Sequence, residues 1–203
     1  MLNRDADYFL ELQTRTGWGR TLYGFAKWCE AQPGWYTLDV GCGPGLLPAI
    51  FSSFGCKAVG VDIDVEMFHP LPLHPMVAIG DACWLPCKPR LFDLITATNL
   101  LFLLPQPMEV LLEMKRLLVP GGKLAMLNPS ENLSQGAALA FARQQGLAGV
   151  AQDTLLNWAR RAEAHQRWTE EETRGLFARA GLVYMGSVLK VGPGFGRFSC
   201  GSL

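Results

Sequence analysis

A glycine-rich segment from Leu38 to Gly45 is the part of the sequence best suited to bind a ligand. Its glycines stand at Gly41, Gly43 and Gly45, where the absence of side chains lets the backbone approach a ligand. A pyrophosphate-binding turn has the pattern G-x-G-x-x-G, but Leu46 directly follows the last of these glycines. The G-x-G-x-G spacing favours a smaller anion, such as an amino-acid carboxylate, at the start of the next helix.

Two aspartates follow the next two apolar segments. Asp62 ends the first segment, where a carboxylate can accept hydrogen bonds from both hydroxyls of a ribose. Asp81 follows Gly80 after the second segment, where it can accept a hydrogen bond from an adenine amino group. Each could instead be an ordinary capping or turn residue. In order along one sheet edge, the glycine segment and the two acids indicate a site for a nucleoside that carries an amino acid.

The elements that must position these residues alternate between strands and helices. This alternation predicts an α/β fold, a doubly wound, mostly parallel Rossmann-like sheet with helices on both faces, in a single domain. The predicted strands are residues 35–40, 58–61, 76–79, 91–98, 123–128 and 182–191, and the main predicted helices are residues 9–31, 46–54, 108–118, 133–166 and 169–181. Asn128 and Pro129 are interpreted as a turn, and residues 197–203 as an antiparallel strand.

Composition excludes several other classes of protein. The 203 residues are 49% hydrophobic, and 18 basic residues balance 18 acidic ones, so we expect no nucleic-acid partner. No apolar stretch reaches the roughly 20 residues of a membrane span, and the N-terminus lacks an apolar signal region, so we expect a cytoplasmic protein. The six scattered cysteines predict neither a zinc site nor any other metal site.

These motifs resemble those of the class I S-adenosylmethionine-dependent methyltransferases, close to the quinone-biosynthesis C-methyltransferase-like group. The resemblance covers residues 35–129 and extends more loosely to residue 191. It rests on the glycine segment, on Val59-Gly60-Val61-Asp62, on Gly80-Asp81-Ala82, on residues 92–99, on residues 117–124 and on residues 168–182.

The resemblance implies S-adenosyl-L-methionine as the cofactor and a role for each matching residue. The methionine part would be held by the loop residues Gly41, Cys42, Gly43 and Gly45. Asp39 would lie behind the cofactor and help to orient it.

The nucleoside part would be held by the two acidic motifs. Asp62 would bind the ribose and Ile63 would lie against the adenine. Asp81 would meet the adenine amino group, and the backbone amide of Ala82 would meet its ring. Asn99 would lie near the methionine end.

The resemblance also divides the chain into four parts. Residues 1–34 would form an N-terminal helical cap that includes Tyr8, residues 35–129 the cofactor-binding core, residues 130–168 a helical insertion over the acceptor pocket, and residues 169–203 the last helix and the edge strands. Two departures are expected: prolines shorten the second crossover helix, and the last antiparallel strand is curtailed.

The implied reaction is in-line methyl transfer to an unidentified small-molecule acceptor. His165 is a weak candidate for a general base, and a solvated histidine is the more ordinary interpretation. Trp158 and Trp168 could line the acceptor pocket, although their spacing is more typical of core residues. The alternative function is a non-catalytic S-adenosylmethionine-binding sensor or partner subunit. A nicotinamide oxidoreductase and a protein or RNA methyltransferase are disfavoured, and the sequence predicts no oligomeric state.

Overall fold

The computed structural model describes residue 11 and residues 16–68 and 76–203, and within them one sheet contains seven strands. The strands are β1 (Tyr36–Val40), β2 (Lys57–Asp62), β3 (Val77–Ile79), β4 (Phe92–Thr98), β5 (Leu118–Pro129), β6 (Val183–Lys190) and β7 (Gly196–Ser202). The α-helices with described bounds are α2 (Gly17–Trp28), α3 (Leu46–Ser53), α4 (Pro107–Leu117), α5 (Gln135–Gln144), α6 (Val150–Ala164) and α7 (Glu170–Arg179).

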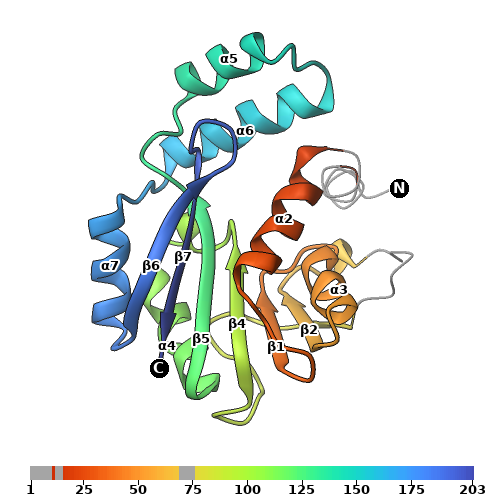
Figure 1. The fold of residues 1–203 in the computed structure, drawn as a ribbon, viewed down its shortest axis with the longest axis vertical. Coiled ribbons are helices and arrows are strands. Elements are labelled where there is room, and N and C mark those ends of the chain that lie inside the picture. The colour runs from red at the N-terminus through yellow and green to blue at the C-terminus, as the bar shows by residue number, and fades with distance from the viewer. Residues whose placement is uncertain (1–10, 12–15, 69–75) are drawn as a thin grey trace.

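The strand order is β3-β2-β1-β4-β5-β7-β6 (Figure 1). Strands β1 to β5 run parallel to their neighbours within that group, whereas β7 is antiparallel to both β5 and β6. Parallel strands present their carboxyl ends at one edge, where ligands of doubly wound sheets bind. The predicted fold class, a mostly parallel Rossmann-like sheet in a single α/β domain, is confirmed.

Helices cover both faces of the sheet (Figure 1). Helices α4 and α7 pack on one face and α2 and α3 on the other, each with its own apolar cluster. Along β5, Leu124 and Met126 belong to the first cluster, while Ala125 and Leu127 belong to the second. This alternation follows from the two-residue period of a strand, and it requires a segment that is apolar on both faces.

The helical segment after β5 forms two helices rather than one. Helices α5 and α6 extend beyond the carboxyl ends of β4 and β5 (Figure 1). Gly146 and Gly149, both with positive φ, lie in the connection between them. Helix α7 begins at a capping box. The Thr169 side chain accepts a hydrogen bond from the Glu172 amide, and the Glu172 carboxylate accepts one from the Thr169 amide.

Two predictions about the last strands are wrong. The final antiparallel strand is not curtailed, because β7 pairs along its whole length with both β5 and β6. Asn128 and Pro129 do not form a turn; they end β5 and pair with Arg197 and Gly196. Strand β7 lies between β5 and β6, so β6 is the edge strand. The end of β5 pairs with residues far along the chain, and local sequence does not predict such a pairing.

The prolines that are expected to shorten the crossover helix between β2 and β3 lie outside the described residues. The described part of this crossover contains a single 3₁₀ turn, η1 (Val65–Met67), capped by Asp64, whose side chain accepts from the Glu66 amide. A second 3₁₀ turn, η2 (Leu101–Leu103), follows β4 and leads into α4. Both turns lie at the carboxyl edge of the sheet, next to the predicted ligand residues.

Candidate cofactor site

The glycine loop turns between β1 and α3 through three left-handed residues. Gly41, Gly43 and Gly45 have φ of 72°, 52° and 92°, a region that side chains disfavour. The Gly41 amide donates to the Val61 carbonyl at 2.8 Å, and the Gly43 amide donates to Asp62 Oδ2 at 2.8 Å. The Gly45 amide donates within the loop at 3.1 Å. The glycines therefore shape the turn, while their own amides bind protein acceptors.

Cys42 anchors the loop to β2. Its side chain is buried, and its amide donates to the Val61 carbonyl at 3.0 Å. Burial, with the nearby acids, raises the pKa of the Cys42 thiol far above its ordinary range. A Cβ atom at Gly60 would stand 2.6 Å from Cys42 Sγ, so the loop is seated directly on this glycine. Cys42 is thus positioned to hold the loop in place as a neutral thiol.

Asp39 is a buried acid at the end of β1. Its side chain is 2% exposed, and Oδ1 accepts a hydrogen bond from Thr96 Oγ1 at 2.7 Å. Burial raises the pKa of Asp39 from 3.8 to about 7, with a further increase from Asp62, while the Thr96 bond acts in the opposite direction. Asp39 and Thr96 are paired neighbours on β1 and β4.

Asp62 ends β2 beside the glycine loop. One carboxylate oxygen accepts from the Gly43 amide and the other from the Asp64 amide at 3.1 Å. A carboxylate has about four lone-pair sites, so both oxygens keep acceptor capacity for a ligand. The neighbouring Ile63 is 70% exposed. A half-exposed acid and an exposed apolar side chain therefore stand together at this strand end.

The Gly80-Asp81 turn lies next to this acid. The Gly80 amide donates to the Asp62 carbonyl at 2.9 Å, which brings the third motif beside the second. Asp81 is exposed, and its Oδ1 accepts from the Cys83 amide at 2.9 Å. Ala82 is half-buried. The order of the three motifs along the carboxyl edge is therefore the one that the sequence predicts.

Asn99 joins this edge to the helical insertion. It follows β4 with φ of +55°, its amide donates to the Leu127 carbonyl at 2.8 Å, and its Oδ1 accepts from Trp158 Nε1 at 3.1 Å. The Trp158 ring also makes an edge contact with Trp18, with ring centroids 5.7 Å apart. Segments from α2, β4 and α6 thus meet over the carboxyl edge.

Another candidate, His165, lies apart from this assembly. His165 is exposed at the C-terminal end of α6, about 10 Å along the helix axis from Trp158 by the rise of an α-helix. Its side chain is therefore not brought to the Asn99 contact. Tyr8 lies outside the described residues. Of the two tryptophans that the sequence left ambiguous, Trp168 is a core residue, whereas Trp158 is half-buried at the carboxyl edge.

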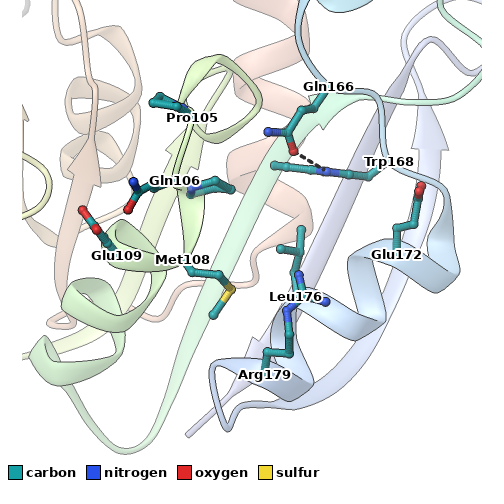
Figure 2. A pocket seen from close by; sticks show the side chains of 10 residues that line it. Pro105, Gln106, Met108, Glu109, Gln166, Trp168, Glu172, Leu176 and Arg179 are labelled. Atoms are coloured by element: carbon teal, nitrogen blue, oxygen red, sulfur yellow. Dashed lines mark hydrogen bonds between the residues drawn. The ribbon is translucent and has the colours of Figure 1, made fainter.

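A pocket of about 560 Å³ lies elsewhere, between α4 and α7 (Figure 2). We call it the α4–α7 pocket. Met108 on α4 and Leu176 on α7 line it from either side, and Trp168 closes its inner end. None of the predicted cofactor residues lines this pocket.

Sequence reasoning missed Thr96 and Trp18. Thr96 could be found by aligning β1 with β4, since the parallel register places it opposite Asp39. Trp18 carries no such signal, because its contact with Trp158 depends on the packing of α2 against α6. Within the described residues, no cluster of acidic, histidine or cysteine side chains could hold a metal ion, and no helix is long and apolar enough to cross a membrane.

Comparison with known proteins shows similarity to methyltransferases over part of the chain. Residues 38–126 match a methyltransferase domain. The ubiquinone biosynthesis O-methyltransferase of Burkholderia thailandensis is 26% identical over 118 residues, which cover 53% of this chain and 51% of that protein. The chain therefore spans about half the length of the curated relatives that it matches.

Solved structures share the fold across nearly the whole chain. A complex of a methyltransferase with its activator from Haloferax volcanii has a TM-score of 0.67 at 17% identity, covering 94% of this chain and 91% of that one. Magnesium protoporphyrin IX methyltransferase from Synechocystis, solved with bound S-adenosylhomocysteine, has a TM-score of 0.64 at 15% identity, covering 92% and 83%.

The fold is that of Rossmann-like methyltransferases. Residues 38–126, which carry the glycine loop and the two acidic motifs, are similar to a methyltransferase domain, and about half of the chain is similar to the Burkholderia thailandensis enzyme. That relative is named as an O-methyltransferase of ubiquinone biosynthesis, whereas the sequence motifs resemble a quinone-biosynthesis C-methyltransferase-like group.

Proposed function

We propose that this protein binds S-adenosyl-L-methionine at the carboxyl edge of its sheet and transfers the methyl group to a small-molecule acceptor. The observation that carries the proposal is the strand end at Asp62. There a carboxylate is held by the Gly43 amide, retains acceptor capacity on both oxygens, and stands beside the exposed Ile63. An acid for a ribose diol and an apolar surface for a purine ring are the two groups that an adenosine needs.

The remaining residues fit the rest of the cofactor. Asp81 and Ala82 follow β3 beside Asp62, where they would meet the adenine edge. Asn99, at the end of β4, would lie near the methionine part. The site is therefore assigned by donor and acceptor chemistry, in the order that the topology gives it.

The loop glycines take a different role from the one the resemblance implies. Since the three glycine amides already donate to protein acceptors, the methionine carboxylate would instead meet the Leu46 and Leu47 amides in the first turn of α3. Pro48, the next residue, has no N–H. An α-helix leaves those amides without intrahelical partners, and its dipole favours an anion there. The glycines would keep that helix start open to the ligand.

When bound, the cofactor supplies an electrophilic methyl group on a positively charged sulfur. Its methyl carbon would bond to the acceptor atom as the sulfur–carbon bond broke, and the electrons of that bond would remain on the sulfur. The protein would contribute by holding the two reactants in line. Asp39, buried behind the loop, would orient it, and α6 would cover the reacting end through the Trp158 contact with Asn99.

Calorimetric titration tests the proposal directly. S-adenosylmethionine and S-adenosylhomocysteine should bind with micromolar affinity, about −8 kcal/mol, and NAD should not bind. Asp62→Ala should weaken S-adenosylmethionine binding by roughly a hundredfold, because it removes charge-assisted hydrogen bonds to the ribose.

Asp93→Ala is a matched control for this substitution. The Asp93 carboxylate also accepts a hydrogen bond from a backbone amide, that of Tyr36, at 2.8 Å. This contact lies at the opposite edge of the sheet, where β1 and β4 begin. Asp93→Ala should leave cofactor affinity unchanged. Equal losses in the two variants would contradict the ribose assignment. Cofactor binding without methyl transfer to any compound in a broad acceptor panel would instead favour the non-catalytic sensor or partner subunit.

A further inference from the structure

Two buried donors on neighbouring strands have no acceptor among the described residues. They are Asn128 Nδ2 on β5 and Arg197 Nε on β7. The two residues are 3% and 5% exposed, and they face each other across the antiparallel β5–β7 ladder. Buried donors are almost always paired in folded proteins, and each unpaired one costs free energy. An unpaired donor on each of two facing residues therefore calls for an explanation.

Asn128 and Arg197 both line one narrow space beside Thr173 of helix α7, which we call the inner cleft. Its walls also include Met126 and Trp168. The cleft has no room for a water molecule in this conformation. Water therefore cannot pair the two donors unless a wall of the cleft moves.

Trp168 is the wall that the inner cleft shares with the α4–α7 pocket. Its backbone forms an isolated parallel β-bridge with Ser130. Its indole Nε1 donates a hydrogen bond to Gln166 Oε1 at 3.0 Å (Figure 2). The backbone is thus fixed, and the ring packs in the apolar core, with one hydrogen bond to a side chain at its polar end. A rotation of this ring would join the cleft to the open pocket.

Charge around the cleft favours a neutral ligand. The Arg197 guanidinium already binds both Glu131 carboxylate oxygens at 2.8 and 2.9 Å, and Glu170 lies at 3.8 Å. Glu131 neutralises this guanidinium, and Glu170 is shared with Arg174, also at 3.8 Å, so Arg197 offers no unbalanced positive charge to an anion. The two unpaired groups are both donors, so a cation without an acceptor atom would not satisfy them.

We propose that the α4–α7 pocket and the inner cleft form one ligand site, gated by Trp168, for a small uncharged molecule with a carbonyl-type oxygen. The oxygen would accept from Asn128 Nδ2 and Arg197 Nε, and the apolar part would lie between Met108 and Leu176. This site is separate from the cofactor residues, and it does not rest on the proposed methyl transfer.

A matched set of three aromatic probes tests the charge and the acceptor. Benzamide carries a neutral carbonyl oxygen, benzoate an anion and benzylamine a cation, on the same ring. Titration of the full chain should show saturable millimolar binding of benzamide and at least roughly tenfold weaker binding of the other two. The indole signal of Trp168 in NMR spectra, assigned with Trp168→Phe, should shift with benzamide as its bond to Gln166 is lost.

Asn128→Asp tests whether benzamide binds in the inner cleft. It replaces the unpaired donor with an acceptor and keeps the oxygen that faces the Phe102 amide. Benzamide should then bind roughly tenfold more weakly. Asn132→Asp, the same change at an exposed position, should leave the affinity unchanged.

Gln166→Ala gives an expectation of the opposite sign. Removing the acceptor that holds the Trp168 indole should strengthen benzamide binding several-fold. It leaves β5 untouched, so it remains informative if Asn128→Asp fails to fold. Benzoate binding as tightly as benzamide, no saturable benzamide binding, or an affinity that neither variant changes would overturn the proposal. A crystal structure grown with benzamide that shows only a water molecule between the two donors would also overturn it.

Discussion

The glycine-loop edge and the face beneath α7 satisfy their buried polar groups in opposite ways. At the glycine loop, the three glycine amides and the buried Asp39 carboxylate all have partners within the protein. Beneath α7, Asn128 Nδ2 and Arg197 Nε have none among the described residues. The first region has its hydrogen bonds within the protein, whereas the two donors of the second would gain partners only from the proposed ligand.

The contrast extends to how each region carries charge. Burial raises the pKa of Asp39 to about 7, so this carboxyl changes its charge near neutral pH. Arg197 is a buried cation that stays charged and therefore depends on Glu131. Substitutions in the two regions should differ accordingly in their dependence on pH and on packing.

The largest expected effect is the pH dependence that Asp39 imposes on stability. Its pKa is raised from 3.8 when unfolded to about 7 when folded. Well below pH 3.8 the carboxyl is protonated in both states. As pH rises toward 7 only the unfolded state releases its proton, so the unfolding free energy falls by about 4 kcal/mol and then levels off. Urea unfolding from pH 4 to pH 8 measures this change.

Asp39→Asn is the control, because it keeps an acceptor for Thr96 and cannot ionise. The variant should lose most of the fall in stability between pH 4 and pH 7. A wild-type protein whose stability did not fall in this range, or an Asn variant with an unchanged profile, would show that Asp39 ionises without difficulty in the folded state.

A smaller effect is expected from the close contact beneath the glycine loop. In Gly60→Ala, the new Cβ would stand 2.6 Å from Cys42 Sγ and 2.8 Å from Pro48 Cγ, so the loop must shift. We expect a loss of about 2 kcal/mol in unfolding free energy together with weaker cofactor binding. Gly136→Ala is the control, since a Cβ there meets nothing within 4 Å and lies in helix α5. If Gly60→Ala kept full affinity, the loop position would not matter for the cofactor.

Local sequence revealed the first region far better than the second. The glycine spacing, the two acids at strand ends and the alternation of elements predicted the fold and the order of the motifs, because each signal lies within a few residues. The partners of the glycine amides and the Asp39–Thr96 bond depend on strand register. The strand β7 and the inner cleft depend on a pairing between residues about 70 positions apart, so Asn128 was mistaken for a turn residue.

The smallest expected effect tests whether the α7 face depends on its ion pair. Glu131→Gln removes the charge opposite Arg197, whose side chain is 6% exposed while that of Glu131 is 38% exposed. We expect a loss of about 1 kcal/mol, since solvent at Glu131 reduces the larger penalty of an unpaired buried charge. The loss should persist in high salt, because a partly buried pair is weakly screened.

Glu171→Gln, on the exposed first turn of α7, is the control and should cost nothing measurable in unfolding free energy. If the two variants unfolded at the same urea concentration, Arg197 would be held by Ser187, Glu170 and the β-ladder, and the charge balance that disfavours an anion in the inner cleft would lose its support.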